Sequence, residues 1–207
     1  MDLAAETIFY MLSLIGTAVF ATSGALQALR NDMDFVGVAF IACVTGVGGG
    51  TMRDLLLGAA PVSWVTNPTD IIICISFALI TVVMNKPLMG RRMDVLLWAD
   101  AVGLALFAVL GAVKAVDYGA HPFTVVLFGA MSATFGGVVR DVICNEIPVL
   151  FRREIYITAA LIGALSFVLL PAGLDEAIRI AIASLIGFTA RACAILFGWS
   201  LPRARVS

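Results

Sequence analysis

The sequence is poor in charge and nearly devoid of histidine, and both shortages narrow what the protein can be. Only 13% of its 207 residues are charged and 61% are hydrophobic, whereas soluble domains are nearer a quarter charged and half apolar. A soluble globule of this composition would have almost no polar surface, which excludes that class. The single histidine, His121, lies before a proline in a turn-like segment. Because no Ser-His-Asp set, metal motif or phosphate loop can be assembled, the sequence predicts neither an enzyme nor a cofactor.

Basic stripes and paired cysteines are missing as well. The net charge is -1 and nothing indicates nucleic-acid binding. No Lys or Arg precedes Arg30, so the basic start of a secretory signal peptide is absent and we expect the first helix to be retained. Four cysteines have neither CxxC nor metal-ligand spacing, and we interpret them as small buried hydrophobes. They are Cys43, Cys74, Cys144 and Cys193.

Long apolar runs are what the sequence has instead. Several reach or approach the ~18 residues that cross the ~30 Å hydrocarbon core of a bilayer. They predict an all-α membrane protein with seven transmembrane helices in one transmembrane domain, residues 1–207. The expected spans are 6–29, 35–57, 68–84, 93–116, 123–144, 154–170 and 175–199.

The distribution of Lys and Arg between the expected spans predicts the orientation. Eight of these residues flank one set of span ends, and only Lys114 is close to a connection at the other. We therefore predict a cytoplasmic C-terminus and an N-terminus outside. The eight are Arg30, Lys86, Arg91, Arg92, Arg152, Arg153, Arg203 and Arg205.

Two glycine-rich motifs stand inside apolar runs, GVGGGTMRD at 46–54 and FGGVVRD at 135–141. The Arg-Asp pair of the second follows that of the first by 87 residues. The same gapless shift aligns Pro61 with Pro148 and the isolated glycines Gly16 and Gly24 with Gly103 and Gly111. The register predicts a duplication, with repeat one at about 6–84, repeat two at about 93–170 and an extra helix at about 175–199. Three spans per unit make the repeats inverted, an arrangement typical of transport folds.

The isolated glycines favour close helix packing, whereas three glycines in a row favour a broken helix whose freed carbonyls face a water-filled path. Carbonyl and hydroxyl oxygens at such a break suit a weakly held monovalent cation. The predicted path-lining residues are Thr45, Gly48, Gly49, Gly50, Thr51, Ser132, Gly136 and Gly137.

Ionisable residues near the membrane are costly and usually face a cavity or a partner. We predict that Asp100 pairs with Arg140, and that Arg53 finds a partner other than Asp54, because adjacent helical residues point about 100° apart. Lys114 either snorkels to the headgroups or forms a positive gate. A structural ion-pair network and a direct conduction role both fit this charged group, which comprises Arg53, Asp54, Asp100, Lys114, Arg140 and Asp141.

The doubled glycine and Arg-Asp motif, each copy followed by a proline, resembles the prokaryotic trimeric intracellular cation (TRIC) channel family, also catalogued under a glycine-transporter domain name. The resemblance covers about Gly16 to Trp199. It implies a homotrimer in a bacterial inner membrane, with one pore per protomer bounded by kinked second and fifth helices and permeable to K+ and other monovalent cations. Phe135 occupies the position equivalent to Gly48 in the second motif, so the two halves of the path are expected to differ.

Two functions therefore remain open from the sequence. One is a K+-permeable channel, with monovalent cations and membrane lipid as partners. The other is a carrier for a small amino acid such as glycine, since a broken helix offers both carbonyls and helix N-termini. A purely structural membrane protein is disfavoured by the paired glycine motifs.

Overall fold

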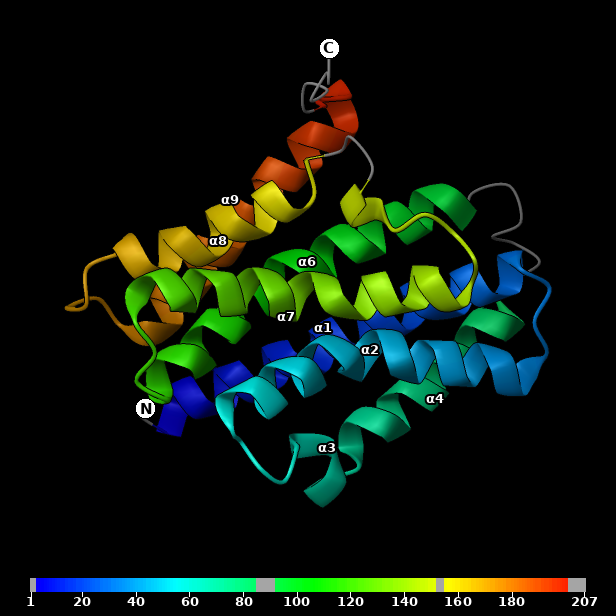
Figure 1. The fold of residues 1–207 in the computed structure, drawn as a ribbon, viewed down its shortest axis with the longest axis horizontal. Coiled ribbons are helices and arrows are strands. Elements are labelled where there is room, and N and C mark those ends of the chain that lie inside the picture. The colour runs from blue at the N-terminus through cyan, green and yellow to red at the C-terminus, as the bar shows by residue number, and fades with distance from the viewer. Residues whose placement is uncertain (1–2, 85–91, 152–154, 201–207) are drawn as a thin grey trace, which may run out of the picture.

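Figure 1 shows a computed structural model of the protein, which describes residues 3–84, 92–151 and 155–200. The described chain is helical with short connections. Its elements are α1 (Leu3–Arg30), α2 (Phe35–Leu57), α3 (Ser63–Thr66), α4 (Thr69–Val83), α6 (Arg92–Asp117), α7 (Pro122–Ile143), the 3-10 turn η1 (Val149–Phe151), α8 (Ile157–Leu169) and α9 (Glu176–Phe197). The long helices lie within a few residues of the spans that the sequence predicts.

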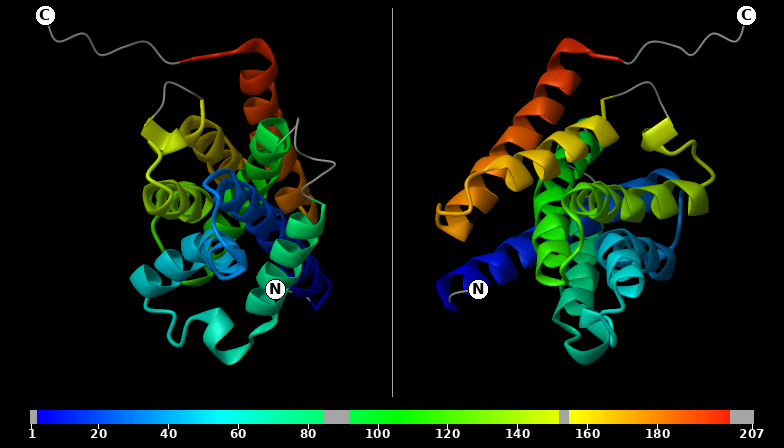
Figure 2. Two further views of the ribbon diagram at one scale, coloured as in Figure 1. Left: turned by 90° about the vertical axis from the view of Figure 1, so that its right-hand side faces the viewer. Right: turned by 60° about the vertical axis from the view of Figure 1, so that its left-hand side comes forward.

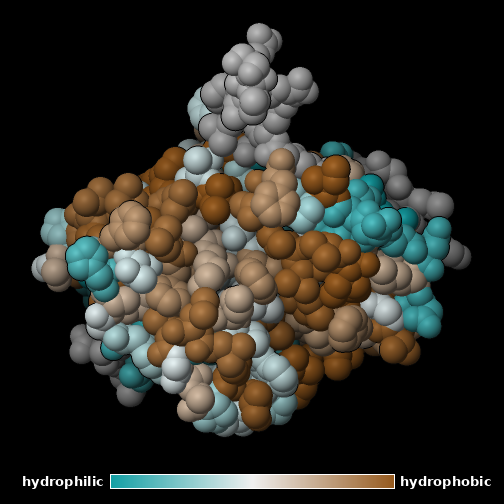
Figure 3. All heavy atoms as spheres, in the orientation of Figure 1, coloured by the Kyte–Doolittle hydropathy of each residue, from teal (hydrophilic) through white to brown (hydrophobic). Residues whose placement is uncertain are grey.

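Five of the described helices, α1, α2, α6, α7 and α9, are long and apolar enough to cross a membrane. The apolar helices α4 and α8 have 15 and 13 residues and so extend roughly 20 Å each at ~1.5 Å per residue. Many large apolar side chains are exposed along these helices. Apolar residues cover most of the face in Figure 3, and hydrophilic ones gather mainly toward its two long-axis ends. This is the surface of a protein whose solvent is lipid.

The centre of the bundle is formed by α1 and α6, which pack against each other. Around them, α1 packs against α2 and α4, and α6 packs against α7 and α8. Helices α2 and α7 also contact each other, which closes the ring. Figures 1 and 2 place α3 and α4 on one side of this core and α8 and α9 on the other.

Local sequence signals fix several helix ends. Asp34 caps α2 by accepting a hydrogen bond from the Gly37 amide at 2.8 Å, and Asp175 caps α9 through the amides of Ala177 and Ile178. Gly58 ends α2 with φ +71°, a left-handed conformation that costs glycine little.

Some sequence-based expectations fall outside the described residues. These are the stop of the third span at Asn85-Lys86-Pro87, the start of the sixth span at Glu154 and its end-flanking charges, and the loop charges Lys86, Arg91, Arg152, Arg153, Arg203 and Arg205.

Candidate functional site

The two glycine motifs meet where α2 crosses α7. Built onto Gly49, a Cβ atom would collide with the carbonyl oxygen of Ser132, and built onto Gly136 it would collide with that of Thr45. Gly48 lies beside Gly136, its own Cβ position 3.4 Å from the Gly136 Cα. The absence of side chains thus lets two backbones touch.

The prediction that these glycines break their helices is wrong. The backbone is helical without interruption over Phe35–Leu57 and Pro122–Ile143. Thr45 hydrogen-bonds within its own helix, to the Ile41 carbonyl at 2.6 Å. Gly49 and Gly136 serve a close crossing here, because the backbone of the partner helix lies where their side chains would be.

A polar cavity lies on each side of the crossing, toward opposite ends of the bundle. The larger, of about 140 Å³, is lined by the first half of α1, the ends of α2 and α6, α3 and the start of α4. The smaller, of about 70 Å³, is lined by the end of α1, the start of α6 and the end of α7. Many of their lining residues are equivalent at the 87-residue offset. The equivalent pairs are Phe9 and Leu96, Tyr10 and Leu97, Arg53 and Arg140, Asp54 and Asp141, Val62 and Val149, and Lys114 and Gln27.

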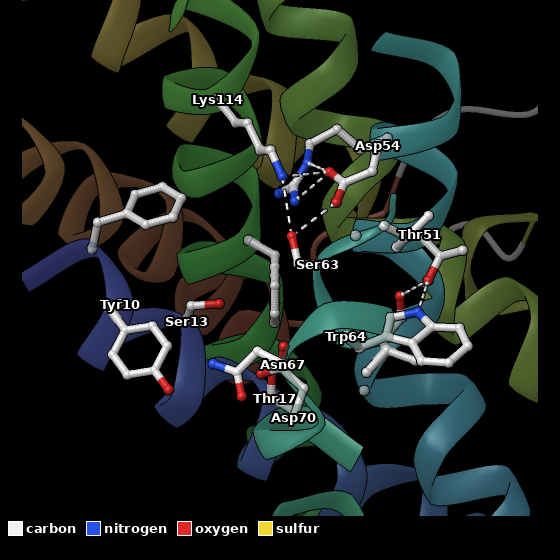
Figure 4. A pocket seen from close by; sticks show the side chains of 17 residues that line it. Tyr10, Ser13, Thr17, Thr51, Asp54, Ser63, Trp64, Asn67, Asp70 and Lys114 are labelled. Atoms are coloured by element: carbon white, nitrogen blue, oxygen red, sulfur yellow. Dashed lines mark hydrogen bonds and ion pairs between the residues drawn. The ribbon is translucent and has the colours of Figure 1, made fainter. Parts of the chain in front are cut away.

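An ion cluster centred on Asp54 lines the larger cavity (Figure 4). Arg53 contacts the Asp54 carboxylate at 2.7 and 2.9 Å, and Lys114 reaches the same oxygen at 2.9 Å. Ser63 of α3 donates to the other carboxylate oxygen at 3.1 Å. The expectation that Arg53 pairs elsewhere is wrong, because its long side chain folds back across the 100° between neighbours. Lys114 points into the cavity rather than toward headgroups.

A more deeply buried ion cluster surrounds Arg140. Its guanidinium contacts Asp100 at 2.8 Å and Asp141 at 2.8 Å, and its side chain is 1% exposed. Ser23 accepts a hydrogen bond from Arg140 and donates one to Asp100. The predicted Asp100–Arg140 pair is confirmed. Two carboxylates and a hydroxyl thus compensate the buried charge of Arg140.

The predicted path-lining residues separate into two groups. Gly50 and Thr51 line the larger cavity. The others are at or near the helix crossing, and Gly137 lies against the Tyr156 hydroxyl and the Arg140 cluster. This second group consists of Thr45, Gly48, Gly49, Ser132, Gly136 and Gly137.

Sequence reasoning missed the wall that α3 and the start of α4 contribute. Trp64 of α3 donates its indole N–H to the Thr51 hydroxyl at 2.9 Å, closing one side of the cavity (Figure 4). Asp70, in the first turn of α4, also lines this wall. A four-residue helix has no hydrophobic period, so the only available signal was the cluster of polar residues at 63–70.

Comparison with known proteins agrees with this architecture. A family model described as "Glycine transporter" matches the chain twice, at residues 10–86 and 97–172. The inner membrane protein YadS of Escherichia coli (strain K12) is 42% identical over 160 residues, 76% of each chain. Membrane protein YvgT of Bacillus subtilis (strain 168) is 35% identical over 199 residues, 93% of this chain and 94% of that protein.

Solved structures match equally well. The TRIC trimeric intracellular cation channel orthologue from Rhodobacter sphaeroides is 43% identical with a TM-score of 0.89, covering 93% of this chain and 100% of that one. A prokaryotic TRIC channel in 0.5 M KCl is 32% identical with a TM-score of 0.89, covering 95% and 100%.

The long apolar helices and the cavities between them define a multi-pass α-helical membrane protein, and the proteins that it resembles are membrane channel proteins rather than enzymes. More narrowly, the chain belongs to the TRIC channel family.

Proposed function

We propose that the protein is a monovalent cation channel, permeable to K+, in a bacterial inner membrane. The observation that carries the proposal is the pair of equivalent polar cavities on either side of the α2–α7 crossing, inside a bundle with an apolar exterior. Structural relatives named as cation channels support the choice of ion, and YadS, named as an inner membrane protein, supports the location.

The path that we propose runs through the larger cavity, past the crossing and into the smaller one. Gly50, Thr51 and the charges of Arg53, Asp54 and Lys114 line its first part. The tight contacts of Gly49 with the Ser132 backbone and of Gly136 with the Thr45 backbone close its middle, so conduction requires α2 and α7 to separate there. Separation would expose the remaining predicted lining residues, which are Thr45, Gly48, Ser132 and Gly137. The smaller cavity, at the far end of the path, is lined by Arg140 and Asp141, and Asp100 is paired with Arg140. Lys114 acts as a movable positive gate in the larger cavity.

Seven spans, with inverted repeats at 6–84 and 93–170 and an extra helix at 175–199, are the topology that we propose for this single domain. The two matches of one family model begin 87 residues apart, which supports the duplication. The two shortest apolar helices, α4 and α8, also occupy corresponding places in the two halves. The loop charges favour an N-terminus outside and a cytoplasmic C-terminus.

Trimeric assembly with one path per protomer completes the proposal, because relatives of 43% and 32% identity are TRIC channels and the first is named as trimeric. The exposed apolar side chains of the protomer would then face either lipid or a second copy.

Flux into liposomes tests the function directly. Purified protein in liposomes should pass K+ down its gradient, monitored with a K+-sensitive dye, while labelled glycine on the same preparation stays outside. Protein-free liposomes provide the background. Glycine uptake without K+ flux would overturn the channel and favour a carrier, the activity that the family model's description names.

A further inference from the structure

One carboxylate in the larger cavity differs from all the others in the two clusters. Asp54, Asp100 and Asp141 each have an Arg or Lys nitrogen within 2.7–2.9 Å. Asp70 lines the same cavity and is half-buried. Its hydrogen-bond partner is the Thr17 hydroxyl at 3.5 Å. Among the residues that the structure describes, no Lys or Arg nitrogen approaches Asp70 within 4.0 Å.

Other oxygen-bearing side chains line the cavity on the side of this carboxylate. Ser13 and Thr17 come from α1, and Figure 4 shows their side chains on the same side of the cavity as Asp70, away from Lys114. Asn67 lies beside them, its side-chain oxygen already occupied by the amide and hydroxyl of Thr69. A carboxylate with two hydroxyls is an oxygen set that suits a hard cation held weakly enough to leave.

The two halves of the protein use their additional carboxylates differently. The position equivalent to Asp70 in the second half is Ile157, and the position equivalent to Ser13 is Asp100. In the second half, Asp100 neutralises Arg140. In the first half, a small hydroxyl residue replaces that carboxylate, and Asp70 enters the cavity from α4 instead.

The charges that line the larger cavity indicate what Asp70 does there. Arg53 and Lys114 bring two positive charges into the larger cavity, and Asp54 offsets one of them. A cation entering this cavity is repelled at the Lys114 end and attracted at the Asp70 end.

From this geometry we infer that Asp70, with the hydroxyls of Thr17 and Ser13, forms a binding site for a monovalent cation in the larger cavity. The inference deepens the proposed channel function and rests on it. The competing explanation is that Asp70 only stabilises the positive end of α4, where it occupies the first turn. That role would affect folding stability but would not make any property depend on the cation.

A binding measurement without flux separates the two explanations. Trp64 lines the cavity and is one of three tryptophans, so a Trp98→Phe, Trp199→Phe background leaves it as the sole reporter. Thallous ion, a heavy substitute for K+, should quench Trp64 saturably in the full-length protein in detergent, and K+ should compete whereas N-methyl-D-glucamine should not. Asp70→Asn should weaken apparent affinity about tenfold, as expected for loss of one unit charge.

Matched variants make the result specific. Asp175→Asn removes a carboxylate that caps α9 away from the cavity, and it keeps a capping side chain, so its quenching should equal that of the parent. Thr17→Val, nearly isosteric, should weaken quenching in the same direction as Asp70→Asn and serves if that variant does not fold. Unchanged affinity in Asp70→Asn, or in Thr17→Val where only that variant folds, overturns the site.

Single-channel recording then links the site to conduction. Asp70→Asn should lower K+ conductance several-fold at low salt and much less near 1 M, where the Debye length is only about 3 Å. If the parent binds thallous ion but passes no K+, the channel function fails and the site stands. If it conducts and Asp70→Asn changes neither binding nor conductance, the site fails and the channel stands.

Discussion

Phe20 of α1 and Phe107 of α6 stack with ring centroids 5.4 Å apart and planes inclined by 10°. The two residues are 87 positions apart. Each ring also covers a glycine of the opposite helix, so that a Cβ on Gly16 would meet Phe107 at 2.8 Å and one on Gly103 would meet Phe20 at 2.5 Å. Reciprocal contacts of this kind, in which each residue meets the equivalent of its partner, are typical of two like units related by a two-fold axis.

The same exchange recurs at the α2–α7 crossing, where Gly49 faces Ser132 and Gly136 faces Thr45. An axis relating inverted halves would pass near both contacts, with one cavity on either side of it. This supports the proposal of inverted repeats and predicts that a change at one position of an equivalent pair has a counterpart at the other.

The adjacent glycines Gly49 and Gly50 should respond oppositely to alanine. At Gly49 a methyl group would strike the Ser132 backbone, whereas at Gly50 its nearest neighbour would be the Arg53 guanidinium at 3.7 Å. We expect Gly49→Ala to lower stability by about 1–3 kcal/mol through overpacking. Gly50→Ala should be neutral or gain up to about 1 kcal/mol from helix propensity. Thermal unfolding in detergent measures both, and equal melting temperatures would contradict the crossing.

The Asp100–Arg140 pair should be strongly coupled. Removing either partner alone leaves a buried charge without its main counter-ion and should cost about 3–5 kcal/mol. Asp100→Asn combined with Arg140→Met should cost less than the sum of the single changes. The Lys114–Asp54 pair, whose lysine side chain is 20% exposed, is the comparison and should give a smaller coupling energy, because Arg53 stays bound to Asp54 when Lys114 is removed. Additive effects at Asp100 and Arg140 would show that their contact contributes no coupling.

Hydropathy and register predicted the helices well, because lipid exposure imposes long apolar runs and duplication leaves a constant offset. They could not decide what Gly48-Gly49-Gly50 does. A broken helix and a close crossing both require a missing Cβ, and the choice depends on whether a partner backbone lies opposite. In this protein the backbone of Ser132 lies opposite Gly49.

The charged site residues were predictable only where they lie in one of the two motifs or in a predicted span next to a motif. Asp100 was correctly paired with Arg140 because both lie in the same half of adjacent predicted spans. The Arg53–Asp54 contact was missed because helical spacing describes where side chains leave the backbone, not how far a guanidinium reaches. Ser63 and Trp64 were missed because they come from a connection whose position over the cavity is set by tertiary packing.

The orientation predicted from loop charge can be read with fused reporters. A reporter placed after Ser207 should be cytoplasmic, and one inserted at 117–119, between α6 and α7, should be outside the cytoplasm. An alkaline phosphatase and a green fluorescent reporter at each site give opposite signals and control for expression. The reverse pattern, or both sites on one side, would overturn the inverted-repeat topology.

Lys114 provides the most direct test of the proposed path. Its amino group lies between Asp54 and Ser63 in the larger cavity, so its charge repels an entering cation. Lys114→Met should raise single-channel K+ conductance several-fold, up to about the tenfold that one unit charge of repulsion can impose. Stability should change less than on loss of Arg140, because Asp54 keeps Arg53 as a partner. Lys114→Arg retains the charge and should conduct like the parent. If Lys114→Met is folded and its conductance also matches the parent, then the larger cavity is not part of the path.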